Sequence, residues 1–385
     1  MQHLAGPMEE THTMMFSYQP PSLRTTFATG NAGGALQQTA GSLGLQRMMV
    51  ITEHGDVHLA RHLTAGLGSV VAGIHPVERQ RFAADASATA RGAAIGLGAD
   101  SLVAVGSGEV IQLARLAAQA AGLPLVAVPT DYSGTEMVPV PAGEGMDGAA
   151  GPGALPKAVV YDAHLVGDLP REQVLHAGLR NLSQCIEAFW APGANPVTTL
   201  LAEEGIRSIA AGLRDLRISS REKLLYGAHL AGTVRATAGT GLLHGVCTTL
   251  SSRFDLPLDQ VHAVMLPHVL GFSTPAAPSA AERIAVALGM PDDAWPAALE
   301  SGFAVASLNR LYEDIGAPHS FTQLGLGKWH AAEAIAAVAA TRPASHPRRM
   351  DRRAASRILR DAFRPVKETL LSTADLSRRL EGIAS

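Results

Sequence analysis

Short apolar runs alternate with amphipathic stretches through the first 165 or so residues of the chain. Val-rich runs bounded by turn residues predict buried strands, and apolar residues spaced three and four apart predict helices between them. This alternation predicts a parallel sheet that helices cover on both faces. The expected strands are residues 47–52, 70–74, 102–105, 125–129 and 158–161, and the expected helices are residues 35–43, 58–67, 79–97 and 109–118.

From Arg171 onward the chain shows helical spacing and turns without a strand pattern. The predicted helices are residues 171–191, 196–214, 219–238, 241–252, 259–273, 279–288, 294–315, 328–340 and 350–363. We therefore expect a disordered leader over residues 1–13, an α/β domain over residues 14–168 and an all-helical domain over residues 169–385. Within the α/β domain, the aromatic segment 14–29 is expected to form an edge hairpin.

One predicted strand and helix are joined by the turn Gly106-Ser107-Gly108. A strand, a glycine turn and a helix together present backbone N–H groups and a positive dipole end to a phosphate. The loop 130–136 follows the next strand, and the carboxyl ends of parallel strands share one edge, so both segments should line one cleft. A turn of this kind can also be a tight connection and nothing more. The expected contacts of a dinucleotide are Gly106, Ser107, Gly108, Thr130, Tyr132 and Ser133.

Composition and charge exclude several classes of protein. The chain of 385 residues is 47% hydrophobic and carries a net charge of −3, with scattered Lys and Arg, so we expect no nucleic-acid partner. No apolar run approaches the ~18 residues that a membrane span needs. The two cysteines make no disulfide framework, and the N-terminus lacks a signal-peptide pattern. These features favour a cytoplasmic protein.

Six longer motifs carry a resemblance to a known family. The chain resembles the iron-containing alcohol dehydrogenases, and within them most closely the maleylacetate reductases, from about Phe16 to Phe363. The resemblance implies a dehydroquinate synthase-like fold, in which an N-terminal dinucleotide-binding α/β domain and a C-terminal all-helical domain flank the active site. It also implies a homodimer. The motifs are VAVGSGEVIQLAR, LPLVAVPTDYSGTEMVPV, GLRNLSQCIEAFWAP, NPVTTLLAEEGIRSIA, GLLHGVCTTLSSRFDLP and HAVMLPHVLGFSTPAAP.

The resemblance also locates the family's metal site. In the wider family an Asp and a His four residues apart on one helix, and two later His fourteen residues apart, hold the metal. Alignment of the motifs places Arg180 and Gln184 at the first pair of positions, His244 at the third and Leu258 at the fourth. A guanidinium repels a metal ion instead of binding it. We therefore expect no metal here, and the maleylacetate reductase branch already departs from the Asp.

The nucleotide cleft departs from the family pattern as well. Glu109 follows the glycine turn, Asp131 stands where the family has a hydroxyl, and the segment 145–150 lacks the Lys of the family's GRKTT-like stretch. Two carboxylates beside a diphosphate should weaken binding, by about 4 kcal/mol for one repulsion at ~4 Å and an effective dielectric of ~20 before screening. The alternative is that the side chains of Glu109 and Asp131 both face solvent and do not weaken binding. The sequence is therefore consistent both with binding of NAD(P)H and with its loss.

We expect Arg180, with Gln184 and His244, to do electrostatically what a metal or a Lys does in relatives. Arg180 would polarise a carbonyl or hold a carboxylate while His244 moves a proton. The alternative is that Arg180 pairs with a neighbouring acid such as Glu187 and only fills the old pocket. The expected substrate contacts are Arg180, Thr248 and His262.

For His262 and Cys247 a purely structural role is an alternative to a role in catalysis or binding. His262 flanks an apolar helix and suits a structural role, and Cys247 is either half of a Cys/His nucleophile pair or a buried, inert thiol.

Three functions are consistent with these residues. The first is a metal-independent, NAD(P)H-dependent reductase of a small unsaturated or keto carboxylic acid, similar to maleylacetate reductase. The second is a redox-neutral dehydratase, lyase or cyclase that reuses the cleft without metal or nicotinamide. The third is a non-catalytic homologue, against which the polar and charged character of the substitutions argues.

Overall fold

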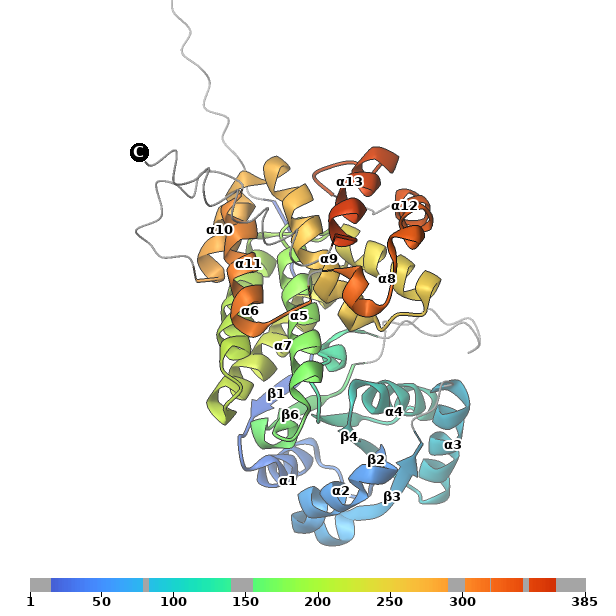
Figure 1. The fold of residues 1–385 in the computed structure, drawn as a ribbon. Coiled ribbons are helices and arrows are strands. Elements are labelled where there is room, and N and C mark those ends of the chain that lie inside the picture. The colour runs from blue at the N-terminus through green and yellow to red at the C-terminus, as the bar shows by residue number, and fades with distance from the viewer. Residues whose placement is uncertain are drawn as a thin grey trace, which may run out of the picture.

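The computed structural model describes residues 15–78, 83–139, 155–289, 302–318, 320–341 and 346–364. The expected leader and the segment 145–150 lie outside these residues. A parallel sheet flanked by helices forms one end of the molecule, and a larger body of helices forms the other end (Figure 1). None of the helices in the described ranges is long and apolar enough to cross a bilayer.

The sheet has six strands in the order β1-β6-β5-β4-β2-β3, and every strand pairing is parallel. Strands β4 and β5 lie in the middle, and each of their residues is buried, which explains their continuous apolar sequence. The bounds are Arg24–Phe27 (β1), Met48–Glu53 (β2), Val71–Val77 (β3), Ser101–Gly106 (β4), Leu125–Pro129 (β5) and Ala158–Tyr161 (β6).

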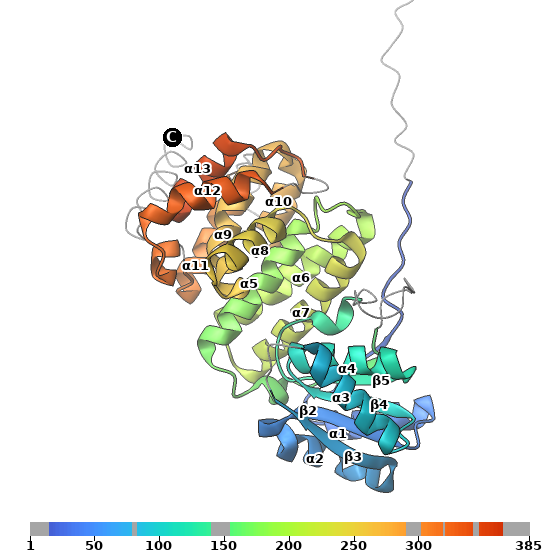
Figure 2. The same ribbon diagram turned by 90° about the vertical axis from the view of Figure 1, so that its right-hand side faces the viewer.

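Alternate residues of the central strands face two different hydrophobic clusters. Val103 and Val105 of β4 belong to the cluster that includes residues of α1 and α2, whereas Leu102 and Ala104 belong to the cluster that includes residues of α3 and α4. Figure 2 shows the two pairs of helices on opposite sides of the sheet. The sequence expectation of a doubly covered parallel sheet is therefore confirmed. The helices are α1 (Ala32–Leu43), α2 (Val57–Thr64), α3 (Ala83–Gly96) and α4 (Gly108–Ala121).

The second part of the chain folds into helices that pack around α5. Helix α5 contacts α6, α7, α8 and α9, so its polar residues are enclosed on several sides. Helix α6 begins with a capping box between Asn195 and Thr198 and with Pro196 in its first turn, and both features favour the start of a helix. The bounds are Arg171–Glu187 (α5), Pro196–Arg214 (α6), Ile218–Ala238 (α7), Leu242–Phe254 (α8), Leu258–Ser273 (α9), Pro278–Ala287 (α10), Phe303–Ile315 (α11), Ala331–Ala339 (α12) and Arg352–Ala362 (α13).

The prediction of an edge hairpin over residues 14–29 is wrong. The described part of that segment contains the single strand β1, which pairs in parallel with β6 through Arg24 opposite Ala158. A hairpin needs an antiparallel neighbour close in sequence, and local alternation cannot reveal a partner that lies more than a hundred residues away.

Several helix boundaries also differ from the expectation, and two of them lie in the α/β domain and in α5. The expected helix 58–67 ends at Thr64 and continues as a 3₁₀ segment in which Gly68 has a positive φ. The expected helix 171–191 ends at Glu187. Residues 290–301, at the start of the expected helix 294–315, lie outside the described ranges.

Close backbone contact joins the loop after β5 to the helical body. A Cβ atom on Gly134 would lie 2.7 Å from the carbonyl oxygen of Ala228, and one on Gly232 of α7 would lie 2.3 Å from the carbonyl oxygen of Gly134. Both positions therefore require glycine. This contact sets the loop directly against α7.

Candidate active site

The turn between β4 and α4 is shaped by the loop that follows β5. The Thr130 N–H donates to the Gly106 carbonyl at 3.0 Å, which ties the two strand ends together. A Cβ on Gly108 would lie 2.4 Å from Ser133 Oγ, so only glycine fits the approach of the loop. Of the expected dinucleotide contacts, the structure thus brings Gly106, Gly108, Thr130 and Ser133 to one edge of the sheet.

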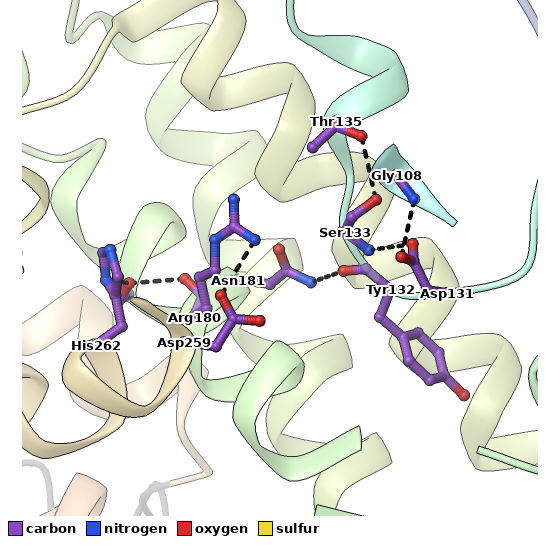
Figure 3. A network of polar contacts seen from close by, with 10 residues as sticks. Gly108, Asp131, Tyr132, Ser133, Thr135, Arg180, Asn181, Asp259 and His262 are labelled. Carbon is purple, nitrogen blue, oxygen red and sulfur yellow. Dashed lines mark hydrogen bonds and ion pairs between the residues drawn. The ribbon is translucent and has the colours of Figure 1, made fainter. Parts of the chain in front are cut away.

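The carboxylate of Asp131 lies at the N-terminus of α4. Its Oδ2 accepts the Gly108 N–H at 2.9 Å and its Oδ1 accepts the Ser133 N–H at 2.9 Å (Figure 3). A carboxylate in this place is stabilised by the helix dipole and occupies an amide that a phosphate would use. Of the two carboxylates expected beside the diphosphate, Asp131 contacts the Gly108 amide, whereas Glu109 is exposed to solvent.

A second acid flanks the turn, and the sequence reasoning missed it. Ser107 Oγ donates to Glu53 Oε1 at 2.8 Å, from the last residue of β2. Glu53 directly follows the predicted strand 47–52, so the rule that binding residues gather at the carboxyl ends of strands could have identified it. The turn 106–108 therefore contacts two carboxylates. Glu53 accepts from the Ser107 hydroxyl, and Asp131 accepts from the Gly108 N–H.

The loop 130–136 is hydrogen-bonded to the helical body by Asn181. The Asn181 side chain on α5 donates to the Tyr132 carbonyl at 2.6 Å. The Tyr132 side chain is only 2% exposed, and burial raises its pKa to about 12. Tyr132 thus contributes its backbone to the junction, and a ligand contact through its ring stays a prediction.

Arg180 lies one residue before Asn181 and forms an ion pair that the sequence reasoning did not predict. Its Nη1 is 3.2 Å from Asp259 Oδ1 at the start of α9, and its side chain is 15% exposed. The expected alternative partner, Glu187, instead accepts the N–H groups of Leu243 at 2.5 Å and His244 at 3.3 Å. Glu187 thus holds the first turn of α8, and burial raises its pKa to about 7 in spite of these bonds.

Two histidines lie beside Arg180 on α8 and α9. The rings of His244 and His262 have centroids 5.6 Å apart. Ser183 Oγ donates its only proton to the Arg180 carbonyl at 2.7 Å and lies 2.7 Å from His262 Nδ1. His262 Nδ1 must therefore be the donor to Ser183, which leaves Nε2 as an unprotonated acceptor. His262 is completely buried, so a structural role and a ligand contact through Nε2 are both consistent with its place.

Burial and nearby cations keep both histidines neutral at pH 7. Burial, together with the charges of Arg235 and Arg180, lowers the pKa of His244 to about 4. The same causes, together with His244, hold the pKa of His262 well below its usual range. Arg235 of α7 was not singled out from the sequence, because its neighbours come from other helices. His244 can therefore serve as a neutral hydrogen-bonding group but not as a stored proton.

Several buried polar atoms in this region have no hydrogen-bond partner among the described residues. Such atoms cost about 1–3 kcal/mol each when they are left unsatisfied, so a bound ligand or water is expected to satisfy them. They are Arg180 Nε, Gln184 Nε2, His244 Nδ1 and His262 Nε2. We call these four residues the polar cluster.

Two further residues near His244 have contrasting environments. Thr248 is exposed one turn after His244 on α8, so it lies on the surface of that helix. Cys247 is fully buried, and burial together with the charge of Glu187 raises its thiol pKa well above the usual value. A neutral thiol is a poor nucleophile, so the geometry favours the inert alternative for Cys247.

Comparison with known proteins decides the family. Residues 28–167 match "Iron-containing alcohol dehydrogenase", and residues 174–363 match "Fe-containing alcohol dehydrogenase family, C-terminal". The chain belongs to the iron-containing alcohol dehydrogenase family. Among its relatives is the maleylacetate reductase of Burkholderia cepacia, 34% identical over 87% of this chain and 95% of the relative. The maleylacetate reductase 2 of Cupriavidus pinatubonensis is 40% identical over 65% of this chain and 72% of the relative.

Solved structures of family members share the whole fold. The iron-containing alcohol dehydrogenase from Corynebacterium glutamicum has a TM-score of 0.81 and 32% identity, covering 93% of this chain and 99% of its own. The maleylacetate reductase from a Rhizobium strain has a TM-score of 0.81 and 30% identity, covering 92% of this chain and 100% of its own. The fold class expected from the sequence is confirmed.

The family's name implies iron, and the residues at the corresponding positions do not fit a metal. Of these positions, occupied here by Arg180, Gln184, His244 and Leu258, only the imidazole of His244 is an ordinary metal ligand. Two of the others are a guanidinium and an apolar side chain. Within the described ranges, no three His, Cys, Asp or Glu side chains gather closely enough to hold an ion.

The turn at α4 has the strand, glycine turn and helix of a dinucleotide site, but Val110 fills the space beside Gly106 and Ser133 fills that beside Gly108. A phosphate placed there must displace the Asp131 carboxylate from the Gly108 amide.

Proposed function

We propose that this protein is a reductase that uses NADH or NADPH to reduce a small unsaturated or keto carboxylic acid without a metal. One observation carries the proposal: a largely buried guanidinium, Arg180, stands among unpartnered polar atoms. The motif alignment assigns this position to a metal ligand of the wider family. The similarity to maleylacetate reductases over most of the chain supports the reaction class. The relatives do not favour the redox-neutral enzyme or the non-catalytic homologue. Assembly as a homodimer and a cytoplasmic location belong to the same proposal.

The guanidinium replaces the metal's electrostatic role. Arg180 donates two N–H groups to a substrate carboxylate or to the carbonyl oxygen on which negative charge develops. Asp259, at 3.2 Å, fixes the direction of the guanidinium and leaves its Nε without a partner among the described residues. A bound nicotinamide would supply the hydride, and the balancing proton comes from solvent because His244 is neutral at pH 7.

The other members of the polar cluster orient the substrate. Gln184 Nε2 offers N–H donors one turn after Arg180, and His262 Nε2 offers a lone pair from α9. A donor and an acceptor on neighbouring helices distinguish a substrate's carbonyl from its hydroxyl group. His244 completes the set as a neutral hydrogen-bond partner.

Cofactor binding and catalysis can be tested separately. Titration with NADH and with NADPH is followed by energy transfer from the tryptophans, and oxidation of the cofactor is then measured with maleylacetate and simpler keto acids. We expect Arg180→Ala to lower kcat/KM by at least about 100-fold, which is about 2.7 kcal/mol. Arg180→Lys should restore only part of this loss, because a lysine cannot donate in a bidentate way.

A matched control is Arg207→Ala, which removes an exposed arginine paired with Glu204 away from the polar cluster. It should leave kcat/KM unchanged. Full activity of Arg180→Ala, or activity that a chelator abolishes and iron or zinc restores, would contradict the proposal.

A further inference from the structure

A groove of about 920 Å³ opens beside α13, in the helical body. Helix α13 lies at the end of the molecule opposite the sheet (Figure 1). Phe272, near the end of α9, forms part of the wall of the groove. Its remaining lining is dominated by Arg348, Arg349, Arg353, Arg357, Arg360 and Arg364. We call it the arginine groove.

The positive charge of the arginine groove is not neutralised by the two acids that line it. Asp351 Oδ1 accepts the Ala354 N–H at 2.8 Å and thereby caps α13, and Asp361 pairs with Arg364 at 3.2 Å. The remaining arginines that α13 contributes have no carboxylate partner among the described residues. The chain as a whole carries a net charge of −3, so the arginine groove concentrates positive charge on a protein that is negative overall.

Aromatic contacts hold part of this charge in place. The Arg348 guanidinium lies 4.4 Å from the centre of the Phe272 ring, and its Nη1 donates to the Phe272 carbonyl at 2.9 Å. Arg357 lies 6.0 Å from the centre of the same ring. His346 stacks on Phe272 with centroids 5.7 Å apart. Guanidiniums that are already positioned lose less entropy when they bind an anion.

Helix α13 itself explains how the arginines come together. Its apolar residues, including Ile358 and Leu359, are buried against α9 and α12. Arg353, Arg357 and Arg360 follow at spacings of four and three, so they share the opposite face, and Arg364 lies just beyond the end of the helix. Like charges at these spacings cost a helix about 0.2–0.5 kcal/mol per pair. A bound polyanion would offset that cost.

We propose that the arginine groove binds a small molecule that carries a chain of two or more phosphate groups. Arginine pairs with phosphate oxygens in a bidentate way, and the arginines from 353 to 360 extend over about 10 Å of helix α13. A single phosphate would span only part of this length, whereas a di- or triphosphate chain reaches several guanidiniums at once. The groove is separate from the turn at α4, so this proposal does not depend on the proposed reductase activity.

The probe is inorganic tripolyphosphate, titrated calorimetrically into the full chain at about 0.15 M salt, where non-specific charge attraction is screened. The double variant Arg353→Ala/Arg357→Ala should bind at least ten-fold more weakly than the unchanged protein. Alanine favours the helix, so α13 should persist, which circular dichroism checks. The matched control Arg207→Ala/Arg217→Ala removes two exposed arginines elsewhere and should bind as the unchanged protein does.

The outcomes separate clearly. Saturable binding that only the α13 double variant loses supports the proposal, and tighter binding of ATP than of tripolyphosphate would identify a nucleoside triphosphate as the natural source. Absence of saturable binding at millimolar tripolyphosphate would overturn it. Equal weakening in both double variants, or equal affinity for inorganic orthophosphate, would also overturn it.

Discussion

The contact between Asp131 and the N-terminus of α4 makes a quantitative prediction about cofactor affinity. The change is Asp131→Asn, which keeps the size of the side chain and an acceptor oxygen but removes the charge. A phosphate that reaches the Gly108 amide must take the place of a carboxylate oxygen that now lies 2.9 Å from that nitrogen. The side chain then remains close to the phosphate, so the two negative charges repel each other.

The magnitude follows from the distance and the exposure. At ~4 Å and an effective dielectric of ~20 the repulsion is about 4 kcal/mol. Asp131 is half-buried, so solvent screens a large part of this energy, and we take about 1.4 kcal/mol as the effect on binding. This corresponds to a ten-fold lower Kd for NADH in the Asp131→Asn variant.

The assay is energy transfer from the tryptophans to bound NADH, with the Kd taken from the titration curve. The control is Glu109→Gln, which removes an exposed acid of the same helix turn and should change the Kd by less than two-fold. An unchanged or higher Kd in Asp131→Asn, with the fold intact, would refute the reasoning. A lack of NADH binding in every variant would instead contradict the proposed function.

Three other predictions concern stability and reactivity. The pKa of Glu187 is about 7 in the folded chain and about 4.5 in the unfolded chain, so at this residue the folded state binds more protons between these values. Glu187 therefore contributes a free energy of unfolding that falls as pH rises from about 4.5 to 7, and Glu187→Gln should remove this contribution. Denaturant titrations of both proteins over this pH range check it, and identical slopes would contradict the assignment. Cys247→Ser should keep at least half of the activity, because the buried thiol stays protonated; loss of turnover would restore the nucleophile hypothesis. Gly232→Ala should lower the melting temperature by several degrees, because its Cβ would lie 2.3 Å from the Gly134 carbonyl, whereas Gly41→Ala, with open space around it, should not.

Local patterns determined a large part of this protein. The strands β5 and β6 were predicted with the bounds that the structure has, because their apolar runs end at turn residues. The bounds of helix α6 agree equally well, since its cap and its first-turn proline lie next to it in sequence. The quoted motifs sufficed to assign the family and therefore the fold. Periodicity and capping depend on neighbours a few residues away, so a single sequence contains them in full.

Tertiary structure alone decided the partners of the charged and polar groups. Arg180 pairs with Asp259, and Ser183 orients His262, in each case across 79 residues of chain that the packing of α5 against α9 brings together. The sequence shows that Asp131 follows β5, but only the fold turns its carboxylate onto the Gly108 amide. Ion pairs and hydrogen bonds act over a few ångströms of space, and the chain order of helices does not specify which of their faces meet.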